Sequence, residues 1–318
     1  MRLKTGGLID RDRPVRFTFD GVNVAGFAGD SVASALLAKG VRVMGRSFKY
    51  HRPRGVVTAG SADPNALITV AEGAAQRPNV RATTQEVYDG LAARSQNAWP
   101  SLTYDVMAVN DLAAPFLGAG FYYKTFMWPR WAWEKVYEPV IRRAAGLGAL
   151  SGQSAEDRSE KAFAHCDLLV IGAGPTGLMA ALTAARAGAD VLLADEEARL
   201  GGRLLSDLRD VGGEAGPDWV AGVVAELDAM PNVRLMTHTT VTGAYDQGTY
   251  GAFERVSYHV ADPGGAPATT FWRIAARAAV LATGALERGI AFPGNDRPGV
   301  MHAGAVQTYA NRYGVAAG

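Results

Sequence analysis

The stretch Gly172-Ala173-Gly174-Pro175-Thr176-Gly177 decides the fold of the second half of this 318-residue chain. An apolar run at 166–171 precedes it and predicts a buried strand, and residues 175–187 predict a helix with small side chains on one face. A glycine-rich turn between a strand and a helix is typical of the Rossmann-type βαβ unit. The sequence therefore predicts an α/β domain that binds the ADP half of a dinucleotide.

Each glycine of this turn has its own task. Gly172 allows the tight turn, Gly174 lets the backbone approach the pyrophosphate, and Gly177 lets the helix pack on the strand. Thr176 lies in the first turn of the predicted helix, where free N–H groups and the helix dipole favour phosphate. The alternative, a glycine-rich turn without a ligand, fits the complete strand–turn–helix context much less well.

Acidic residues end the next predicted strand, which covers 189–195. The Asp195 carboxylate is placed to accept hydrogen bonds from the adenine ribose hydroxyls, and it would repel a 2′-phosphate. This position favours NAD or FAD over NADP. Glu196 and Glu197 follow, and the sequence supports equally a contact with the adenosine and simple exposure to solvent.

Two more turns complete the predicted nucleotide site. In the stretch Leu200-Gly201-Gly202-Arg203, Gly202 and Arg203 can line the pyrophosphate groove. A strand at 278–282 runs into the small-residue turn of Thr283 and Gly284, which we also assign to the site. The five histidines are scattered without ligand spacing, so we expect no metal site and no catalytic residue in this chain.

Composition narrows the class of protein. The length suits about two domains, and 48% hydrophobic with 20% charged residues is usual for a globular protein with a core. The net charge of +1 gives no reason to expect a nucleic acid partner. Cys166 is the only cysteine, which excludes an internal disulfide and a four-thiolate centre, so we expect no iron–sulfur cluster.

Neither a secretory signal nor a membrane span is predicted. The first seven residues lack an apolar stretch after their charges. Residues 168–185 carry no charge, but their glycines and Pro175 fall where a nucleotide-binding turn needs them. We therefore expect a cytoplasmic protein without membrane association.

Three segments divide the chain. Residues 1–95 predict a small α+β module with a hairpin at Asp20-Gly21, a helix at 31–39 that Gly40 ends, and strands at 41–43 and 66–70. Residues 96–160 form an aromatic-rich helical arm and linker, and residues 161–318 form the dinucleotide-binding domain, which we expect to be incomplete.

The arm concentrates large rings and is broken by prolines. It has to bury this apolar surface either on the rest of the chain or on a partner subunit, and the sequence supports both equally. The rings are Trp99, Phe116, Phe121, Tyr122, Tyr123, Phe126, Trp128, Trp131, Trp133 and Tyr137.

The second half resembles the disulfide-oxidoreductase-like flavoproteins over about 165–302. The glycine turn, Val280–Ala285 and Phe292–Val300 carry this resemblance. It implies FAD at the glycine turn and a second dinucleotide domain beyond the turn at Thr283, where this chain has few residues left. It also implies a backbone contact from Val241 to adenine, although a valine in the core of a strand would give the same sequence pattern.

The first half resembles the ferredoxin-like module of the α subunits of amine-oxidising flavoenzymes. Residues 17–21, 29–38 and 46–55 carry this resemblance. Relatives such as the cyanide synthases and opine dehydrogenases place cluster cysteines in the next stretch, whereas 56–67 has none here. With 121–126 and 137–143, the pattern is similar to the α subunits of heterotetrameric sarcosine oxidases, and it implies a β-grasp module without a cluster.

This resemblance implies a function for the whole complex. Sarcosine would be demethylated to glycine, with hydrogen peroxide and 5,10-methylenetetrahydrofolate as the other products. FAD and FMN are expected in the complex, β, γ and δ subunits as partners, and NAD in this chain, with FAD as the alternative. Two other functions stay open: a self-contained FAD-dependent oxidoreductase and a non-catalytic NAD-binding assembly subunit.

Overall fold

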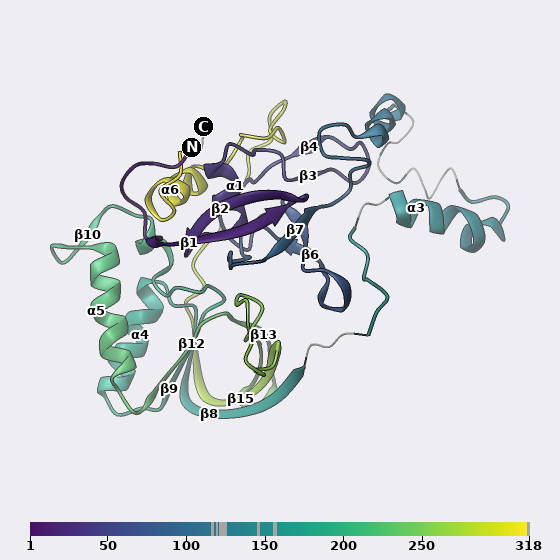
Figure 1. Cartoon of the computed structure of the whole chain (residues 1–318). Coiled ribbons are helices and arrows are strands. Elements are labelled where there is room, and N and C mark those ends of the chain that lie inside the picture. Colours follow the sequence, from purple (N-terminus) through teal and green to yellow (C-terminus); the bar gives the residue numbers. More distant parts are fainter. Residues whose placement is uncertain (116–117, 119, 121–125, 145–146, 155–157, 317–318) are drawn as a thin grey trace.

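A computed structural model of the chain describes residues 1–115, 118, 120, 126–144, 147–154 and 158–316. Two β-sheets make up the body of the molecule, and an arm extends away from it (Figure 1). Within the described ranges, no helix is both long and apolar enough to cross a bilayer.

The first sheet has five strands in the order β2-β1-β7-β5-β6. The strands are β1 (Asp10–Phe19), β2 (Val22–Ala28), β5 (Leu67–Val70), β6 (Arg77–Arg81) and β7 (Ala92–Ser95). β1 and β7 run parallel and the other neighbours antiparallel. Helix α1 (Val32–Ala38) packs into the same core, and β3 (Gly45–Arg46) pairs with β4 (Pro53–Arg54) as a separate ribbon.

Local signals set the turns of this module. Asp20 and Gly21 both adopt positive φ, 50° and 75°, which confirms the predicted type of hairpin turn. Ser31 and Ser34 exchange side-chain and backbone hydrogen bonds in a capping box at the start of α1. Gly40, with φ of +88°, follows the helix end as expected. The predicted strand at 41–43 is wrong, because these residues have no strand partner.

The second sheet has six strands in the order β12-β9-β8-β15-β14-β13. The first four strands pair in parallel, and β14 pairs antiparallel with both β15 and β13. They are β8 (Ser159–Ile171), β9 (Val191–Ala194), β12 (Val233–Met236), β13 (Thr239–Tyr245), β14 (Thr249–Arg255) and β15 (Thr269–Leu281). Helices α4 (Pro175–Arg186) and α5 (Gly216–Asp228) cover one face. Leu169 and Leu192 belong to the core of the other face. This Rossmann-like α/β arrangement confirms the predicted fold of the second half.

The last helix, α6 (Ala303–Asn311), returns to the first sheet. Tyr309 is fully buried in the core of that sheet, and its hydroxyl donates to the Thr58 carbonyl at 3.1 Å. Val315, just beyond the helix, forms a bridge with Arg2, which brings the chain ends together (Figure 1). The return of the chain places α6 between the first sheet and the ends of the second.

The arm lies to one side of the body (Figure 1). It contains the 3-10 helix η2 (Val106–Ala113), the π-helix η3 (Trp133–Tyr137) and the α-helix α3 (Glu138–Ala144). Trp99, Trp128 and Trp131 are 65%, 84% and 65% exposed. The predicted aromatic residues Phe116, Phe121, Tyr122 and Tyr123 lie outside the described residues.

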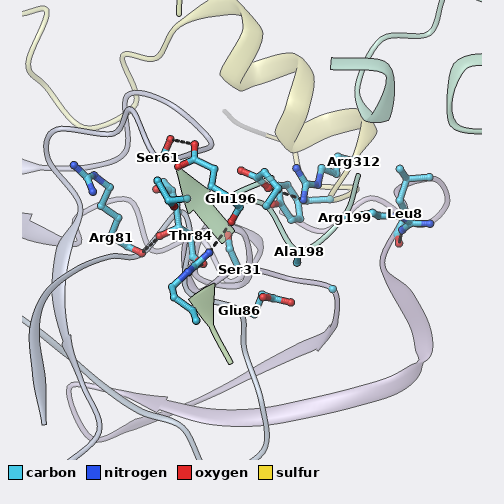
Figure 2. Close-up of a pocket in the computed structure, with 16 residues that line it drawn as sticks. Leu8, Ser31, Ser61, Arg81, Thr84, Glu86, Glu196, Ala198, Arg199 and Arg312 are labelled. Atoms are coloured by element: carbon cyan, nitrogen blue, oxygen red, sulfur yellow. Dashed lines mark hydrogen bonds and ion pairs between the residues drawn. The ribbon is translucent and has the colours of Figure 1, made fainter. Parts of the chain in front are cut away.

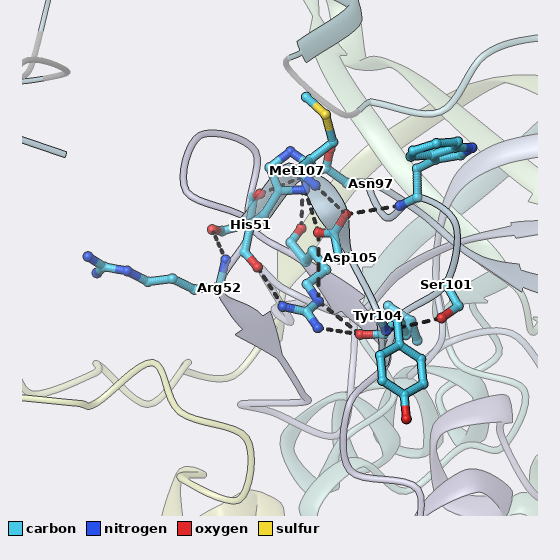
Figure 3. A network of polar contacts seen from close by, with 11 residues as sticks. His51, Arg52, Asn97, Ser101, Tyr104, Asp105 and Met107 are labelled. Atoms are coloured by element: carbon cyan, nitrogen blue, oxygen red, sulfur yellow. Dashed lines mark hydrogen bonds and ion pairs between the residues drawn. The ribbon is translucent and has the colours of Figure 1, made fainter. Parts of the chain in front are cut away.

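A buried polar network holds the base of the arm (Figure 3). The Asp105 carboxylate accepts hydrogen bonds from the backbone N–H groups of Trp99 and Met107. Its other oxygen lies 2.7 Å from His51 Nδ1. The arm is therefore anchored to the first module at Asp105, although its rings project beyond.

Short elements fill the remaining connections. They are η1 (Gly73–Ala75), η4 (Gly202–Leu205), η5 (Asp246–Gly248), β10 (Asp210–Val211) and β11 (Glu214–Ala215).

Candidate functional site

A cleft of about 750 Å³ opens at the carboxyl ends of β8, β9 and β15. One wall consists of the glycine turn and the start of α4, and the opposite wall of residues 58–62 of the first module together with α6. The carboxyl edge of parallel strands is where open α/β sheets bind ligands. The first module therefore closes a site that the second sheet begins.

The glycine turn has the shape that a close approach to phosphate requires. A Cβ atom at Gly172, whose φ is +97°, would lie 2.5 Å from the Ala282 carbonyl oxygen, and one at Gly177 would lie 1.8 Å from the Gly172 carbonyl oxygen. A Cβ atom at Gly174 would meet nothing within 4 Å, because this residue faces the open cleft. Two of the glycines are thus required by packing, and the third leaves the backbone accessible.

The Asp195 carboxylate is held rigidly at the edge of the cleft. Oδ2 accepts a hydrogen bond from the Ala173 N–H at 2.6 Å, and Oδ1 accepts one from the Glu197 N–H at 2.8 Å. Burial raises the pKa of Asp195, against the opposite effect of these two hydrogen bonds. Each carboxylate oxygen has a second lone pair, so the group can still accept from ligand hydroxyls.

Glu196 and Glu197 line the cleft and are tied to other parts of the chain. Ser61 Oγ donates to Glu196 Oε1 at 2.5 Å, and Arg312 pairs with Glu197 at 3.0 Å. Arg255 donates to the Glu196 carbonyl at 2.8 Å. The acidic loop 195–197 is therefore fixed from the first module, from α6 and from β14, a role that neither sequence interpretation included.

The remaining predicted residues gather around the same opening. A Cβ atom at Gly202, whose φ is +53°, would lie 3.0 Å from Gly174 Cα, so the two glycine turns pack closely. The cleft lining also contains Thr176, Arg203, Val241, Thr283 and Gly284. Gly177 lies behind the surface and is not part of the lining.

Several lining residues had no signal in the sequence. Thr58, Ser61, Thr308 and Arg312 reach the cleft only because the first module and α6 fold over it. Glu287 was missed as well; its carboxylate accepts from the Gly304 N–H in the first turn of α6. Such contacts join residues far apart in the chain, and no local pattern predicts them.

A smaller pocket of about 240 Å³ continues beyond the acidic loop (Figure 2). It lies between the first module and the second sheet, and its wall includes Glu196, which also lines the cleft. Its charged lining residues are Arg81, Glu86, Glu196, Glu197, Arg199, Arg255 and Arg312.

Comparison with known proteins relates both halves to described families. Residues 12–98 match the model of a 2Fe-2S iron-sulfur cluster binding domain, and residues 167–229 match that of FAD dependent oxidoreductases. The structure of L-proline dehydrogenase from P. horikoshii matches 100% of this chain and 50% of its own, with a TM-score of 0.64 and 20% identity. This likeness supports the mixed α/β fold.

Two relatives match nearly the whole chain. Sarcosine oxidase subunit alpha of Rhizobium meliloti is 60% identical over 318 residues, which are 100% of this chain and 32% of the relative. The protein of the same name from Corynebacterium sp. (strain P-1) is 38% identical over 98% of this chain and 28% of its own length. The chain thus spans about a third of these relatives.

The expectation of no iron–sulfur cluster is contradicted by the match of residues 12–98 to a cluster-binding family. The residues of the matched range nevertheless do not supply the usual ligands, because the one cysteine, Cys166, lies outside it. In the loop 57–66, four backbone N–H groups donate hydrogen bonds to the Asp63 carboxylate. The residues of this range therefore do not fit a 2Fe-2S cluster.

Proposed function

We propose that this chain, which is homologous along its whole length to sarcosine oxidase subunit alpha, binds a dinucleotide within an amine-oxidising enzyme. The observation that carries the proposal is the cleft, because all predicted binding residues except Gly177 line it. NAD is the proposed ligand. The match to FAD dependent oxidoreductases favours FAD as the alternative, and both contain the same ADP half.

The chain's own residues would bind and orient this ligand. The N–H groups at the start of α4, next to Gly174, would hold the pyrophosphate. The Asp195 carboxylate would accept from the ribose hydroxyls, Val241 would meet the adenine, and Arg203 would lie along the phosphates. These are binding groups, and none of them is a general base or a nucleophile for an amine.

The chemistry of the whole enzyme is proposed from the homology. Sarcosine would be oxidised and demethylated to glycine, with hydrogen peroxide and 5,10-methylenetetrahydrofolate as products, and β, γ and δ subunits would complete a heterotetramer. FAD and FMN in the complex would supply the acceptor for the hydride. This chain would contribute nucleotide binding and assembly in the cytoplasm.

We propose the domain organisation on the same grounds. Residues 1–95 would be a ferredoxin-like β-grasp module, residues 96–160 the arm and linker, and residues 161–318 the dinucleotide-binding domain. The match of residues 12–98 and the two separate sheets support this division.

The test is to identify the nucleotide that purified protein releases on denaturation, by mass spectrometry and absorbance. Stoichiometric NAD supports the proposal, FAD supports the alternative, and binding of neither in calorimetry would refute it. Asp195→Ala should weaken NAD binding about tenfold or more, since charge-assisted hydrogen bonds contribute roughly 1.5–3 kcal/mol. Peroxide release from sarcosine by this chain alone with FAD would instead favour the self-contained oxidoreductase.

A further inference from the structure

Three titratable side chains meet where the first module faces the second sheet. His238 Nε2 lies 2.6 Å from Glu86 Oε1. The imidazole ring of His259 stacks on that of His238, with ring centroids 4.0 Å apart and planes inclined by 10°. Glu86 precedes β7, whereas the histidines follow β12 and β14, so the cluster joins the two sheets. Glu86 also lines the pocket beside the acidic loop (Figure 2).

The main chain of His238 is hydrogen-bonded to the acidic loop that lines the nucleotide cleft. Its N–H donates to the Glu197 carbonyl at 3.1 Å, and the next residue, Thr239, donates to the Asp195 carbonyl at 2.8 Å. His238 has a φ of +52°, which few residues with a Cβ atom adopt. One residue in this fixed conformation thus contacts Glu86 through its side chain and the acidic loop 195–197 through its backbone.

The geometry favours a shared proton over a metal ion. Two histidines and a carboxylate are a common ligand set, and their ligand atoms lie within 4.8 Å of one another. However, imidazole binds metals through a lone pair in the ring plane. The lone pairs of two rings stacked nearly parallel run side by side and do not converge on one ion. The distance between His238 and Glu86 is also that of a hydrogen bond.

The surrounding charges and burial determine the protonation states of the three groups. Burial lowers the pKa of His259, and the charges of His238 and Arg255 lower it further, against the attraction of Glu86. The pKa of Glu86 is also lowered, because its hydrogen bond and ion pair with His238 outweigh burial. Arg77, another cation on this side, stacks on the ring of Tyr258. At neutral pH, an ionised Glu86 therefore faces His238, and His259 is neutral.

We propose that Glu86, His238 and His259 form a proton-dependent joint that positions the acidic loop, so that protonation of His259 weakens dinucleotide binding. A proton on His259 would place a positive charge in a partly buried stack, 4.0 Å from the His238 ring and near Arg255, and this charge would be repelled from the stack. His238 is then a positioning residue, because it acts on the ligand through Glu197 and Asp195. The inference rests on the proposed function of the cleft.

The direction of the pH effect follows from linkage. A histidine whose pKa is lower in the folded protein binds fewer protons there than in the unfolded chain. Stability from the joint is therefore complete above the ordinary histidine pKa of about 6.5 and is lost as the pH falls below that value. Affinity for the nucleotide should fall as the pH drops through the lowered pKa of His259 in the folded protein.

The test measures binding of ADP-ribose by calorimetry at about pH 8 and about pH 5.5, on either side of the ordinary histidine pKa. The wild-type protein should bind about threefold or more weakly at the acid pH. His259→Phe keeps a flat ring but cannot take a proton, so its affinity should be the same at both. His165→Phe, a matched change at an exposed position on β8 outside the cleft, should keep the wild-type dependence.

Each other outcome is informative. An equal fall in the wild-type protein and in His259→Phe would overturn the joint, as would stoichiometric zinc binding that His259→Phe abolishes. If ADP-ribose binds at neither pH, the proposed function fails. The joint is then judged by thermal unfolding against pH, where parallel curves for the two proteins would overturn it and an acid loss confined to the wild type would support it.

Discussion

At the scale of single residues, Asp63 is a buried anion of the first module. It is 1% exposed, and its two oxygens accept four hydrogen bonds from the N–H groups of Val57, Thr58, Asn65 and Ala66, at 2.7 to 2.9 Å. A buried carboxylate replaces the missing backbone partners of a whole loop. The loop is therefore more sensitive to this residue than to any apolar neighbour of similar size.

We expect Asp63→Ala to lower the free energy of unfolding by about 3 kcal/mol or more, because each buried unpaired donor costs roughly 1–3 kcal/mol. Urea denaturation measures this change. The exposed Asp12→Ala is the control and should stay within about 0.5 kcal/mol of the wild type. An Asp63→Ala protein as stable as that control would show that water replaces the carboxylate.

The glycine turn allows folding to be separated from binding. Gly174→Ala adds a methyl group where nothing lies within 4 Å, so the protein should fold normally but bind NAD about tenfold or more weakly, as the methyl keeps the phosphates from the backbone. Gly177→Ala places its methyl 1.8 Å from a carbonyl oxygen and should destabilise the fold itself. Unfolding curves and calorimetry on both variants check the contrast. Equal losses of stability would contradict it.

At the scale of elements, the sequence predicted those helices and strands that local interactions determine. The helix after the glycine turn and the strands predicted at 66–70 and 189–195 match α4, β5 and β9 closely. By contrast, β8 and β15 pair from Ser159 and Thr269 onward, well before the apolar runs that predicted them. The first half of β8 is polar and largely exposed, and it is a strand because β15 pairs with it. The first half of β15 carries the aromatic residues Phe271 and Trp272 and pairs with β14 as well.

Helix α6 is the clearest case of long-range structure. Tyr309→Ala should lower the unfolding free energy by about 3–5 kcal/mol, as for other buried aromatic residues. Hydrogen exchange should then accelerate in β1 and β5 rather than in β9 and β12, because α6 belongs to the first core. Val306→Ala, on the exposed side of the same helix, is the control. Acceleration confined to the second sheet would place α6 in the other core.

At the scale of the whole molecule, one wall of the candidate site follows from the sequence. The glycine turns and Asp195 sit at strand ends that a βαβ unit always brings together. The opposite wall, with Ser61 and Arg312, depends on how the first module and α6 dock against the second sheet. Many residues along that interface determine the docking together, so no single stretch of sequence predicts it. The joint at His238 was missed for the same reason, since its partner Glu86 lies in the other module.

The arm carries exposed aromatic side chains. Among its described residues, Trp128 and Trp131 are both exposed, and exposed apolar patches usually mark an interaction site. The relatives are named as a subunit of an enzyme, so the proposed occupant is another subunit of that complex. The two tryptophans would then be buried on assembly, while the anchor at Asp105 stays as it is.

Trp128→Ser together with Trp131→Ser should leave the unfolding free energy of this chain within about 0.5 kcal/mol, because neither ring is part of a core. NAD affinity should be unchanged, since the arm is remote from the cleft. Assembly with the other subunits should weaken about tenfold or more, because exposed aromatic anchors often contribute 2 kcal/mol or more at interfaces. Co-purification of the complete complex and sedimentation measure this effect. Normal assembly of the variant would contradict this assignment. Self-association of the isolated chain that the variant abolishes would assign the surface to a second copy of this chain instead.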